Sequence, residues 1–427
     1  MSISRRSFLK TSALVAAPCI IPTSARGATA PSRRLTAGFI GVGGRSTGHL
    51  RGYVGLNDVQ VLAVCDVDAR RLAAAQQLVE TAYAQRPAVG TYKGCAAYKD
   101  FRELLARDDI DLVVIGTPDH WHSLISAAAA KSGKDIYCEK PLTVFIGEGR
   151  PVIDAVRRYG RVLQVGSQER SSWGSRHAVE LVRNGRIGAL RRVTVKLPVA
   201  VRDCGQQPEM PIPEGFDYDM WLGPAPLAPY TQRRTHGSFR YILDYSGGEM
   251  TDRGAHVGDI AMWGAYPFLK GPVEIQGKGK LFNSLYDTAY EFRIDFAYAN
   301  GVNMVVTSEG NRGILFEGDD GWVHVEIHGS RLTASRPSLL STVISPQEIR
   351  VHRSSDHRQD FLDAVRTRGQ VVAPPDEGHR SAMLCHLSNI ALLLGRKLTW
   401  DPARERFIND PEADRMTYRP MRSPWTF

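Results

Sequence analysis

The amino-acid sequence predicts a fold with two sheets: a doubly wound parallel α/β sheet, followed by an open and mostly antiparallel β-sheet. From Leu35 to about Gly185, short apolar runs alternate with helical patterns, the order that a parallel sheet with crossover helices requires. After Gly185, apolar and polar residues alternate along runs that end at turn residues, which indicates antiparallel hairpins with one solvated face. The chain has 427 residues, 43% of them hydrophobic, enough for two or three domains.

Residues 1–30 have the pattern of an export signal. Ser4 to Lys10 form the run SRRSFLK, an apolar stretch follows from Thr11 to Ile21, and small residues lie from Ala25 to Ala30. This order is similar to a twin-arginine signal, and its apolar stretch is too short to span a bilayer. We therefore expect the twin-arginine export machinery to deliver the protein, already folded, to the periplasm without stable membrane insertion.

Composition excludes other classes. The formal charge of +9 includes the basic leader, and no dense Lys/Arg run with interleaved aromatic residues follows it, so we expect no nucleic-acid partner. The cysteines beyond Cys19 are odd in number, and Cys65 and Cys138 lie in apolar runs where free thiols pack as small hydrophobic groups. We expect no disulfide framework, as suits a protein that folds before export.

Individual elements follow from these patterns. In a first domain, residues 33–185, the expected strands are Thr36–Ile40, Val59–Cys65, Leu112–Ile115, Asp135–Tyr137 and Val162–Val165, with helices at Ala69–Ala84 and Ser123–Ser132. In a second domain, residues 186–350, the expected strands are Leu190–Val199, Val273–Lys280, Tyr290–Tyr298, Val302–Ser308, Ile314–Glu317 and Trp322–Ile327. Gln206–Tyr230 is expected to be a long ordered loop. Residues 351–427 are expected to form helices, at Asp356–Arg366 and Glu377–Leu394, and a tail that pack back on both domains.

A glycine-rich loop follows the first expected strand. Its glycines, Gly41, Gly43 and Gly44, would allow a tight turn and a close approach of backbone amides to a pyrophosphate at the start of a helix. Ser46 stands where a third glycine is usual, and it is small enough for close packing of helix and strand. A plain glycine turn remains the alternative for this stretch considered alone.

A carboxylate at the end of the second strand favours one dinucleotide over another. Asp66 could accept hydrogen bonds from an adenosine ribose and would repel a 2′-phosphate, which favours NAD over NADP. The alternative for Asp66 is a helix N-cap. Arg45 could contact phosphate or be solvated, and it leaves NADP open.

Further motifs follow in order along the chain: TPDHWH at 117–122, CEKP at 138–141, GSQER at 166–170, WLGPAP at 221–226 and GGEMTDRGAH at 247–256. Together with the glycine loop, this set resembles the Gfo/Idh/MocA oxidoreductase family over nearly the whole chain after the leader. The resemblance implies an N-terminal Rossmann domain that binds NAD, and a C-terminal open-sheet domain that contributes to substrate binding and to oligomers, dimers or tetramers.

The resemblance also implies roles for single residues. It places the cofactor at Gly41, Gly43, Gly44, Arg45, Ser46, Asp66, Thr117, His120, Glu139, Lys140 and Gln168. It places the substrate, a sugar, glycoside or polyol, at Lys140, Arg170, Asp252 and His256. His256 would be the general base, Lys140 its partner, and Asp252 the group that orients the imidazole and binds substrate.

The residue pattern permits other interpretations of the same stretch. Asp252, His256 and Asp259 fall on about one face of a helix, where a helix cap with a core histidine is the simple alternative. A metal site formed by these residues, with His120 or His122, is chemically possible, but we expect none because the sequence lacks a compact metal-ligand motif.

The sequence therefore predicts a periplasmic NAD(H)-dependent oxidoreductase that transfers hydride between a carbinol carbon and a tightly held nicotinamide. Free cofactor is scarce outside the cytoplasm, so the cofactor would be exported inside the folded protein and restored in each cycle. An NAD-dependent glycosidase, which oxidises its sugar transiently, satisfies the same requirement and remains an alternative. A non-catalytic sugar-binding protein is the third possibility.

Overall fold

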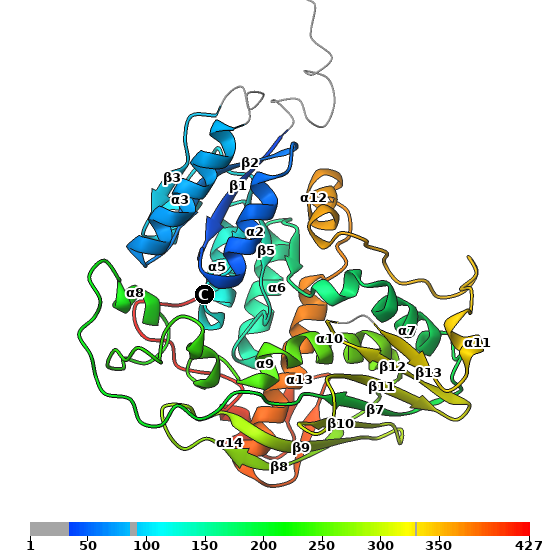
Figure 1. Cartoon of the computed structure of the whole chain (residues 1–427). Coiled ribbons are helices and arrows are strands. Elements are labelled where there is room, and N and C mark those ends of the chain that lie inside the picture. Colours follow the sequence, from blue (N-terminus) through cyan, green and yellow to red (C-terminus); the bar gives the residue numbers. More distant parts are fainter. Residues whose placement is uncertain (1–33, 86–91, 329–330) are drawn as a thin grey trace, which may run out of the picture.

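The computed structural model describes residues 34–85, 92–328 and 331–427 of the chain (Figure 1). The predicted export signal lies outside these residues. Within them, a parallel sheet forms the upper part of the molecule in Figure 1, and a larger sheet lies below it with a group of helices between.

The first sheet confirms the predicted Rossmann domain. Its strand order is β3-β2-β1-β4-β5-β6 and every pairing in it is parallel. The order reverses beside β1, and in such sheets a ligand binds outside the carboxyl ends of the strands at that point. The strands are β1 Leu35–Ile40, β2 Val59–Cys65, β3 Ala96–Tyr98, β4 Leu112–Ile115, β5 Asp135–Cys138 and β6 Leu163–Val165.

Helices cover both faces of this sheet. Strands β1, β2 and β4 are buried through most of their length, because apolar side chains on each face pack against a helix layer. The sequence did not predict β3, which is short and lacks a buried residue, but it pairs with β2. These helices are α2 Gly44–Val54, α3 Ala69–Ala84, α4 Phe101–Leu105, α5 His122–Lys131 and α6 Gly149–Arg158. Helix α7, Trp173–Arg183, follows the sheet in sequence but packs in the core of the second domain.

The second sheet is open and mostly antiparallel, as the sequence predicts. Its order is β13-β12-β11-β7-β10-β9-β8-β14-β15, and β7 with β10 is its one parallel pair among the described residues. The strands are β7 Leu190–Lys196, β8 Val273–Leu281, β9 Ala289–Tyr298, β10 Asn303–Thr307, β11 Gly313–Gly318, β12 Gly321–Glu326, β13 Leu332–Ala334, β14 Leu398–Asp401 and β15 Arg406–Phe407.

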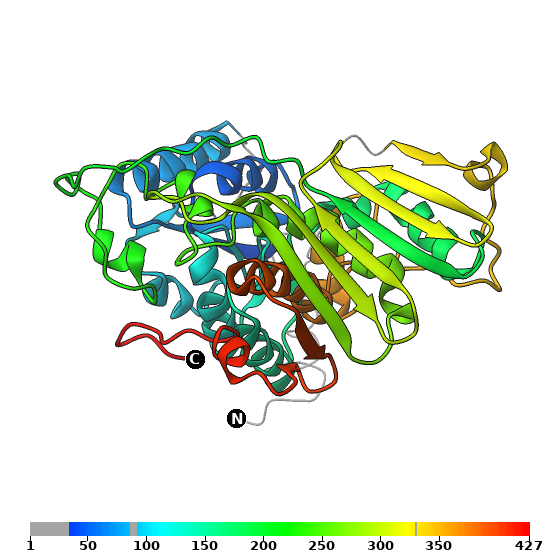
Figure 2. The same ribbon diagram turned by 90° about the horizontal axis from the view of Figure 1, so that it is seen from below.

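One face of this sheet packs on helices and forms the largest core. Val193, Ile294, Met304 and Phe316 point to that side and are fully buried. The covering helices lie behind the strands in Figure 2. The other face carries charged pairs such as Arg293 with Asp295 and is left open in the single chain.

The expected single helix around Asp252 is two helices. α9 spans Glu249–Asp252 and α10 spans Gly254–Ala265, with Arg253 as the junction. The remaining helices are α8 Tyr218–Leu222, α11 Pro337–Leu340, α12 His357–Thr367, α13 Pro375–Leu394 and α14 Pro411–Arg415. Helix α12 begins after Asp356, whose carboxylate accepts from two backbone amides, so the predicted start of that helix agrees with its cap.

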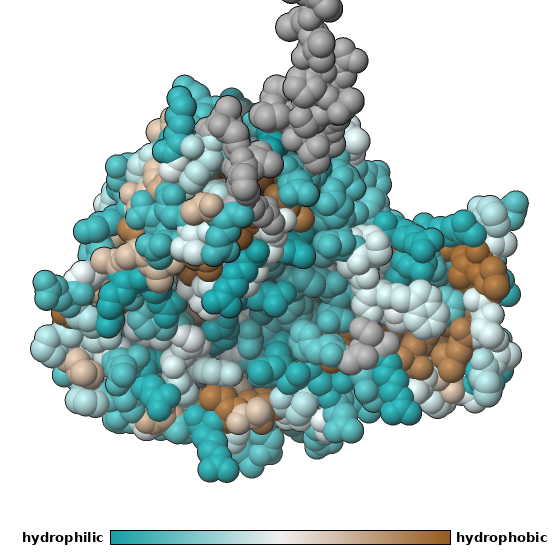
Figure 3. All heavy atoms as spheres, turned by 45° about the horizontal axis from the view of Figure 1, so that its top comes forward, coloured by the Kyte–Doolittle hydropathy of each residue, from teal (hydrophilic) through white to brown (hydrophobic). Residues whose placement is uncertain are grey.

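The surface in Figure 3 is mainly hydrophilic, with hydrophobic residues gathered at the outer end of the second domain. Val343, which follows α11 in the chain, is an exposed large apolar residue of the second domain. No helix among the described residues has the length and hydropathy needed to cross a bilayer. The described cysteines are free thiols: Cys65, Cys95, Cys138, Cys204 and Cys385.

Candidate functional site

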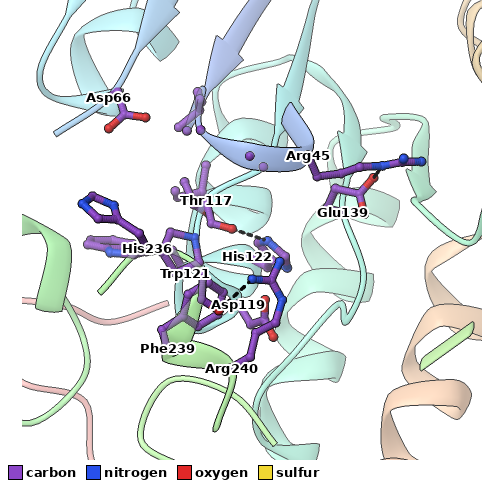
Figure 4. A pocket seen from close by; sticks show the side chains of 18 of the residues that line it. Arg45, Asp66, Thr117, Asp119, Trp121, His122, Glu139, His236, Phe239 and Arg240 are labelled. Atoms are coloured by element: carbon purple, nitrogen blue, oxygen red, sulfur yellow. Dashed lines mark hydrogen bonds and ion pairs between the residues drawn. The ribbon is translucent and has the colours of Figure 1, made fainter. Parts of the chain in front are cut away.

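A cavity of about 470 Å³ opens at the carboxyl ends of β1, β2, β4 and β5 (Figure 4). Its opposite wall comes from the segment Phe216–Arg240 and from α9 and α10 of the second domain. The cavity is long enough to run from Asp66 at one end to Asp252 and His256 at the other. It therefore occupies the place where a doubly wound sheet binds a ligand.

The glycine loop at this cavity is shaped for an anion. Gly41 has a φ of +75°, and a Cβ there would lie 2.6 Å from the backbone nitrogen of Thr117. Helix α2 begins after Gly43 without a side-chain cap and without an acidic residue in its first turn. Its first amides are thus free to bind a phosphate, and the helix dipole favours one. The residues present fit the pyrophosphate of a dinucleotide.

Ser46 and Thr117 support this loop. Ser46 is fully buried, and a Cβ on Gly116 would lie 2.6 Å from its Cβ, so helix α2 and strand β4 approach as closely as the third-position glycine usually allows. Ser46 contacts the protein interior and is absent from the cavity wall, whereas Gly41, Gly43, Gly44, Arg45 and Thr117 line it. The Thr117 hydroxyl is buried without a protein partner, a polar group left for a ligand or water.

Asp66 lies at the end of the cavity where the ribose is expected. Its two carboxylate oxygens accept from the backbone amides of Val42 and Asp68, at 2.8 and 2.9 Å. Burial raises its pKa despite these bonds. The helix N-cap is Asp68, whose carboxylate accepts from the amides of Arg70 and Arg71, so Asp66 does not have the capping role left open above. The guanidinium of Arg71 lies over Gly43, on the same wall.

Glu139 is held as a buried anion in the middle of the cavity. His49 Nε2 donates to it at 2.6 Å and the Gln168 amide at 2.8 Å, while Arg45 lies 3.9 Å away. Burial acts to raise the pKa of Glu139, but the hydrogen bond and charge of His49 lower it to about 2. The contact between Arg45 and Glu139 is visible in Figure 4. Glu139 and Gln168 thus meet at the cavity wall.

The two domains meet in an ion pair beside the cavity. The Lys140 ammonium donates to the Asp252 carboxylate at 3.0 Å and to the Asp252 backbone carbonyl at 2.7 Å. Arg240 donates to the same carboxylate at 3.2 Å. Burial acts to raise the pKa of Asp252, but Lys140 and Arg240 hold it well below the usual carboxyl range. The Lys140–Pro141 peptide bond is cis, the isomer that the sequence makes accessible.

His256 lies at the same end of the cavity and is 9% exposed. Its Nδ1 is buried without a hydrogen-bond partner, and the described residues include no hydrogen bond between its ring and Asp252. Burial, and second to it the charge of Lys140, holds the pKa of His256 well below the ordinary imidazole value. Lys140, Arg240 and Arg253 instead contact the Asp252 carboxylate, and the role of Asp252 in orienting the His256 ring stays a prediction.

Besides Ser46, two more predicted site residues lie outside the cavity wall. Arg170 is 1% exposed and donates to both oxygens of Asp259, at 2.7 and 2.8 Å, so it joins α10 to the first domain instead of facing a substrate. His120 is fully buried, and its Nε2 lies 2.9 Å from the carbonyl of Trp221, which tethers the segment above the cavity. Burial lowers the pKa of His120 to about 3. The Asp259 carboxylate accepts from Arg170 and Ser381, and the part of the chain that the structure describes contains no group of three or more His, Cys, Asp or Glu side chains arranged to hold a metal ion.

Sequence profiles of the oxidoreductase family described as "NAD-binding Rossmann fold" and "C-terminal alpha/beta domain" match residues 35–167 and 200–427. The chain belongs to the Gfo/Idh/MocA family. This confirms the predicted family, its NAD-binding Rossmann domain and its oxidoreductase class.

Curated proteins similar in sequence match only part of this chain. A glycosyl hydrolase family 109 protein of Shewanella pealeana is 36% identical over 177 residues, which are 37% of this chain and 38% of the relative. An α-N-acetylgalactosaminidase of Shewanella oneidensis is 30% identical over 210 residues, 44% of each protein. The matched part of the chain therefore spans less than half the length of these relatives.

Solved structures of similar fold cover nearly the whole described chain. The WlbA dehydrogenase of Bordetella pertussis, in complex with NADH and UDP-GlcNAcA, has a TM-score of 0.63 at 15% identity and covers 86% of this chain and 98% of its own. The aldose-aldose oxidoreductase of Caulobacter crescentus, complexed with glycerol, has a TM-score of 0.61 at 17% identity, covering 86% and 99%. At these identities the likeness shows the Gfo/Idh/MocA fold alone.

Sequence reasoning missed several residues of this site. Arg71, His236, Phe239 and Arg240 line the cavity but lie in stretches with no recognisable spacing. Asp119 lies in the TPDHWH motif, whose pattern indicates no role for it, but it is buried at the cavity and accepts from the Ser246 hydroxyl at 2.5 Å. His328 and Glu169 also line the cavity, and only the tertiary fold brings them to it.

Proposed function

We propose that the protein is an NAD(H)-dependent oxidoreductase of a sugar, glycoside or polyol. The observation that supports this most directly is the placement of Lys140 and His256, from separate domains, at one end of the cavity whose other end has the glycine loop. An ammonium and an imidazole at that place can handle the proton of a hydroxyl group, which hydride transfer from the neighbouring carbon requires.

The side chains have distinct tasks in this proposal. Bound NAD would supply the acceptor and donor of hydride at the carbinol carbon. Lys140 stabilises negative charge that develops on the reacting oxygen, because its ammonium is already anchored by Asp252 and needs little reorganisation. His256 accepts the hydroxyl proton, since its lowered pKa leaves the ring neutral near pH 7. Asp252 binds and orients Lys140.

We propose NAD as the cofactor in preference to NADP. The Asp66 carboxylate is fixed toward the ribose end by two backbone amides, and an anion there repels a 2′-phosphate. Arg71 lies close enough to attract a 2′-phosphate, which would favour NADP. The proposed preference for NAD therefore depends on the charge of Asp66. Asp66→Ala should narrow the ratio of NADP to NAD dissociation constants. An unchanged ratio in that variant would contradict the role given to Asp66.

We further propose that the protein works in the periplasm with its cofactor retained. A second-domain segment lies across the adenosine end, tied by hydrogen bonds from Ala69 to Gly215 and from Asp217 to Val67, at 2.9 Å each. Trp425 of the carboxyl-terminal tail packs on Trp121 beneath it, at 4.7 Å between ring centroids. A covered cofactor leaves slowly. Dialysis of the purified protein, followed by mass spectrometry, tests whether the cofactor is retained. The export proposal has a separate test: replacing Arg5 and Arg6 by lysine should block export.

The glycosidase is the second candidate, because the curated relatives are named as glycosyl hydrolases of family 109 and one as an α-N-acetylgalactosaminidase. A chromogenic glycoside separates the two. Chromophore release without net change in the nicotinamide absorbance supports hydrolysis, whereas a stable keto sugar with reduced nicotinamide supports oxidation. Binding without either reaction supports the sugar-binding alternative.

We propose a homo-oligomer as well. The open face of the second sheet, with its paired charges, leaves a large surface for a second copy. Light scattering of the purified protein should give a mass above that of one chain, and a monomer at micromolar concentration would contradict it.

A further inference from the structure

His328 is the aromatic ring that packs directly against His256. It follows β12 in the second domain, and the two imidazole rings meet edge to face with centroids 5.1 Å apart and an interplanar angle of 79°. Asp252, the expected partner of His256, is bound instead to Lys140 and Arg240. The titratable group whose ring packs on the buried His256 is therefore a second imidazole.

Glu169 holds this second imidazole in place. Its Oε1 lies 3.2 Å from His328 Nδ1, and its Oε2 is buried with no hydrogen-bond partner. Glu169 belongs to the short helix Gln168–Ser171 after β6, so the contact joins the two domains across the cavity. A carboxylate oxygen that is buried without a partner is costly unless it faces a cation or a proton donor for part of the cycle.

Exposure to solvent increases from His256 to His328. His256 is 9% exposed, and the His328 side chain is 45% exposed while still lining the cavity. A proton that reaches His256 has no direct hydrogen-bonded exit through Asp252, but it can reach solvent through His328. The groups that face His256 are Lys140 and Glu139 of the first domain, Asp252 of α9, and His328 itself.

We propose that Glu169 and His328 form a proton relay for His256. The inference rests on the proposed function. When the C–H hydrogen leaves as hydride to the nicotinamide, the O–H proton of the same carbinol passes to His256. It then passes to His328, directly or through one water, and from the exposed imidazole to solvent. Glu169 keeps the Nδ1 proton of His328 in place and stabilises the charge when Nε2 gains a second proton. The reverse sequence supplies the proton when a carbonyl is reduced.

The backbone at His328 decides which substitutions test this. His328 has a φ of +66°, a left-handed conformation that asparagine and glycine tolerate best. His328→Asn therefore removes the imidazole with least strain, and His328→Gly leaves room for added imidazole. His324→Gln is the matched control: His324 lies on β12 and does not line the cavity.

In the wild-type protein we expect single-turnover reduction of bound nicotinamide by substrate. We expect His328→Asn and Glu169→Gln to lower that rate about 100-fold, which is the low end of the effects of losing a proton-transfer group. The nucleotide affinity should not change. Added imidazole should restore turnover in His328→Gly. The control His324→Gln should turn over at the wild-type rate, and added imidazole should not change that rate. The solvent deuterium isotope effect should grow in the relay variants. A merely structural contact would produce neither the rescue nor the isotope effect.

A second measurement needs no turnover. Nitrogen-15 chemical shifts of neutral His328 should show the proton on Nδ1 in the wild type and a mixture of tautomers in Glu169→Gln. Wild-type rates and isotope effects in the variants, or a tautomer unaffected by Glu169→Gln, would overturn the relay while leaving the oxidoreductase in place. No hydride transfer by the wild type, with nucleotide bound, would overturn the proposed function and the relay with it.

Discussion

Replacing Gly43 by alanine separates cofactor binding from folding. Gly43 has a φ of −85° and a ψ of 169°, which alanine adopts without strain. A Cβ there would lie 1.7 Å from the Arg71 guanidinium, but this is the end of a flexible side chain that is 35% exposed and can swing toward solvent. We expect the free energy of unfolding to change by less than about 1 kcal/mol, because the added methyl group can be accommodated once the Arg71 side chain moves aside.

Nucleotide binding should respond differently. The added methyl group would stand where a pyrophosphate must approach the first amides of α2, and it would displace Arg71 as well. Losing one charge-assisted hydrogen bond costs about 1.5–3 kcal/mol. The dissociation constant for NAD should therefore rise about 10- to 150-fold, since 1.4 kcal/mol corresponds to a factor of ten.

The matched control is Gly48→Ala, in the same helix. A Cβ at Gly48 meets nothing within 4 Å, and the residue is exposed. This change should stabilise the helix by about 0.5–1 kcal/mol and leave NAD affinity alone. Calorimetric titration with nucleotide, together with urea unfolding, measures both quantities. Equal NAD affinities for Gly43→Ala and Gly48→Ala would refute the assignment of the pyrophosphate to this loop.

Lys140→Met should lower kcat by about 10²- to 10⁴-fold, the range for a proton-handling group. It should also lower the free energy of unfolding at pH 7 by about 1–3 kcal/mol, because Asp252 loses a buried partner. Lys140→Arg, which keeps the charge, should recover the free energy of unfolding more than it recovers kcat. Glu139 has a folded pKa of about 2 against about 4.3 unfolded, so its carboxylate stabilises the protein above pH 4.3 and this contribution falls as the pH drops toward 2. The difference in unfolding free energy between wild type and Glu139→Gln should therefore shrink over that interval; a constant difference would contradict the buried anion. Arg170→Met leaves Asp259 buried without its cation, and the unfolding free energy should fall by about 3–5 kcal/mol in urea titrations, whereas a loss below 1 kcal/mol would show that Ser381 compensates.

The strongest sequence signals were the buried parallel strands. β2 Val59–Cys65 and β4 Leu112–Ile115 agree with prediction at both ends, because each is a compact and mainly apolar run that begins directly after an aspartate. The glycine loop and Asp66 were found for a related reason: backbone geometry restricts which residues can stand there. Such constraints are local, so a single sequence reveals them.

The contacts of side chains between domains could not be predicted in the same way. Helical spacing placed Asp252 beside His256, yet the helix breaks at Arg253 and three cations take the carboxylate. Arg170 was assigned to substrate from its motif, but its pairing with Asp259 depends on how α10 docks on the first domain. His328 approaches His256 only because the second sheet places the end of β12 over the cavity. These are tertiary facts without a periodic signal.

The most direct test of the account is to measure the nicotinamide nucleotide bound to freshly purified protein, and its redox state before and after a panel of sugars, glycosides and polyols is added. The account predicts bound NAD in wild type and in His256→Ala alike, with substrate-dependent reduction only in the wild type. Protein that binds no nicotinamide nucleotide, or a His256→Ala variant that reduces NAD at the wild-type rate, would contradict it.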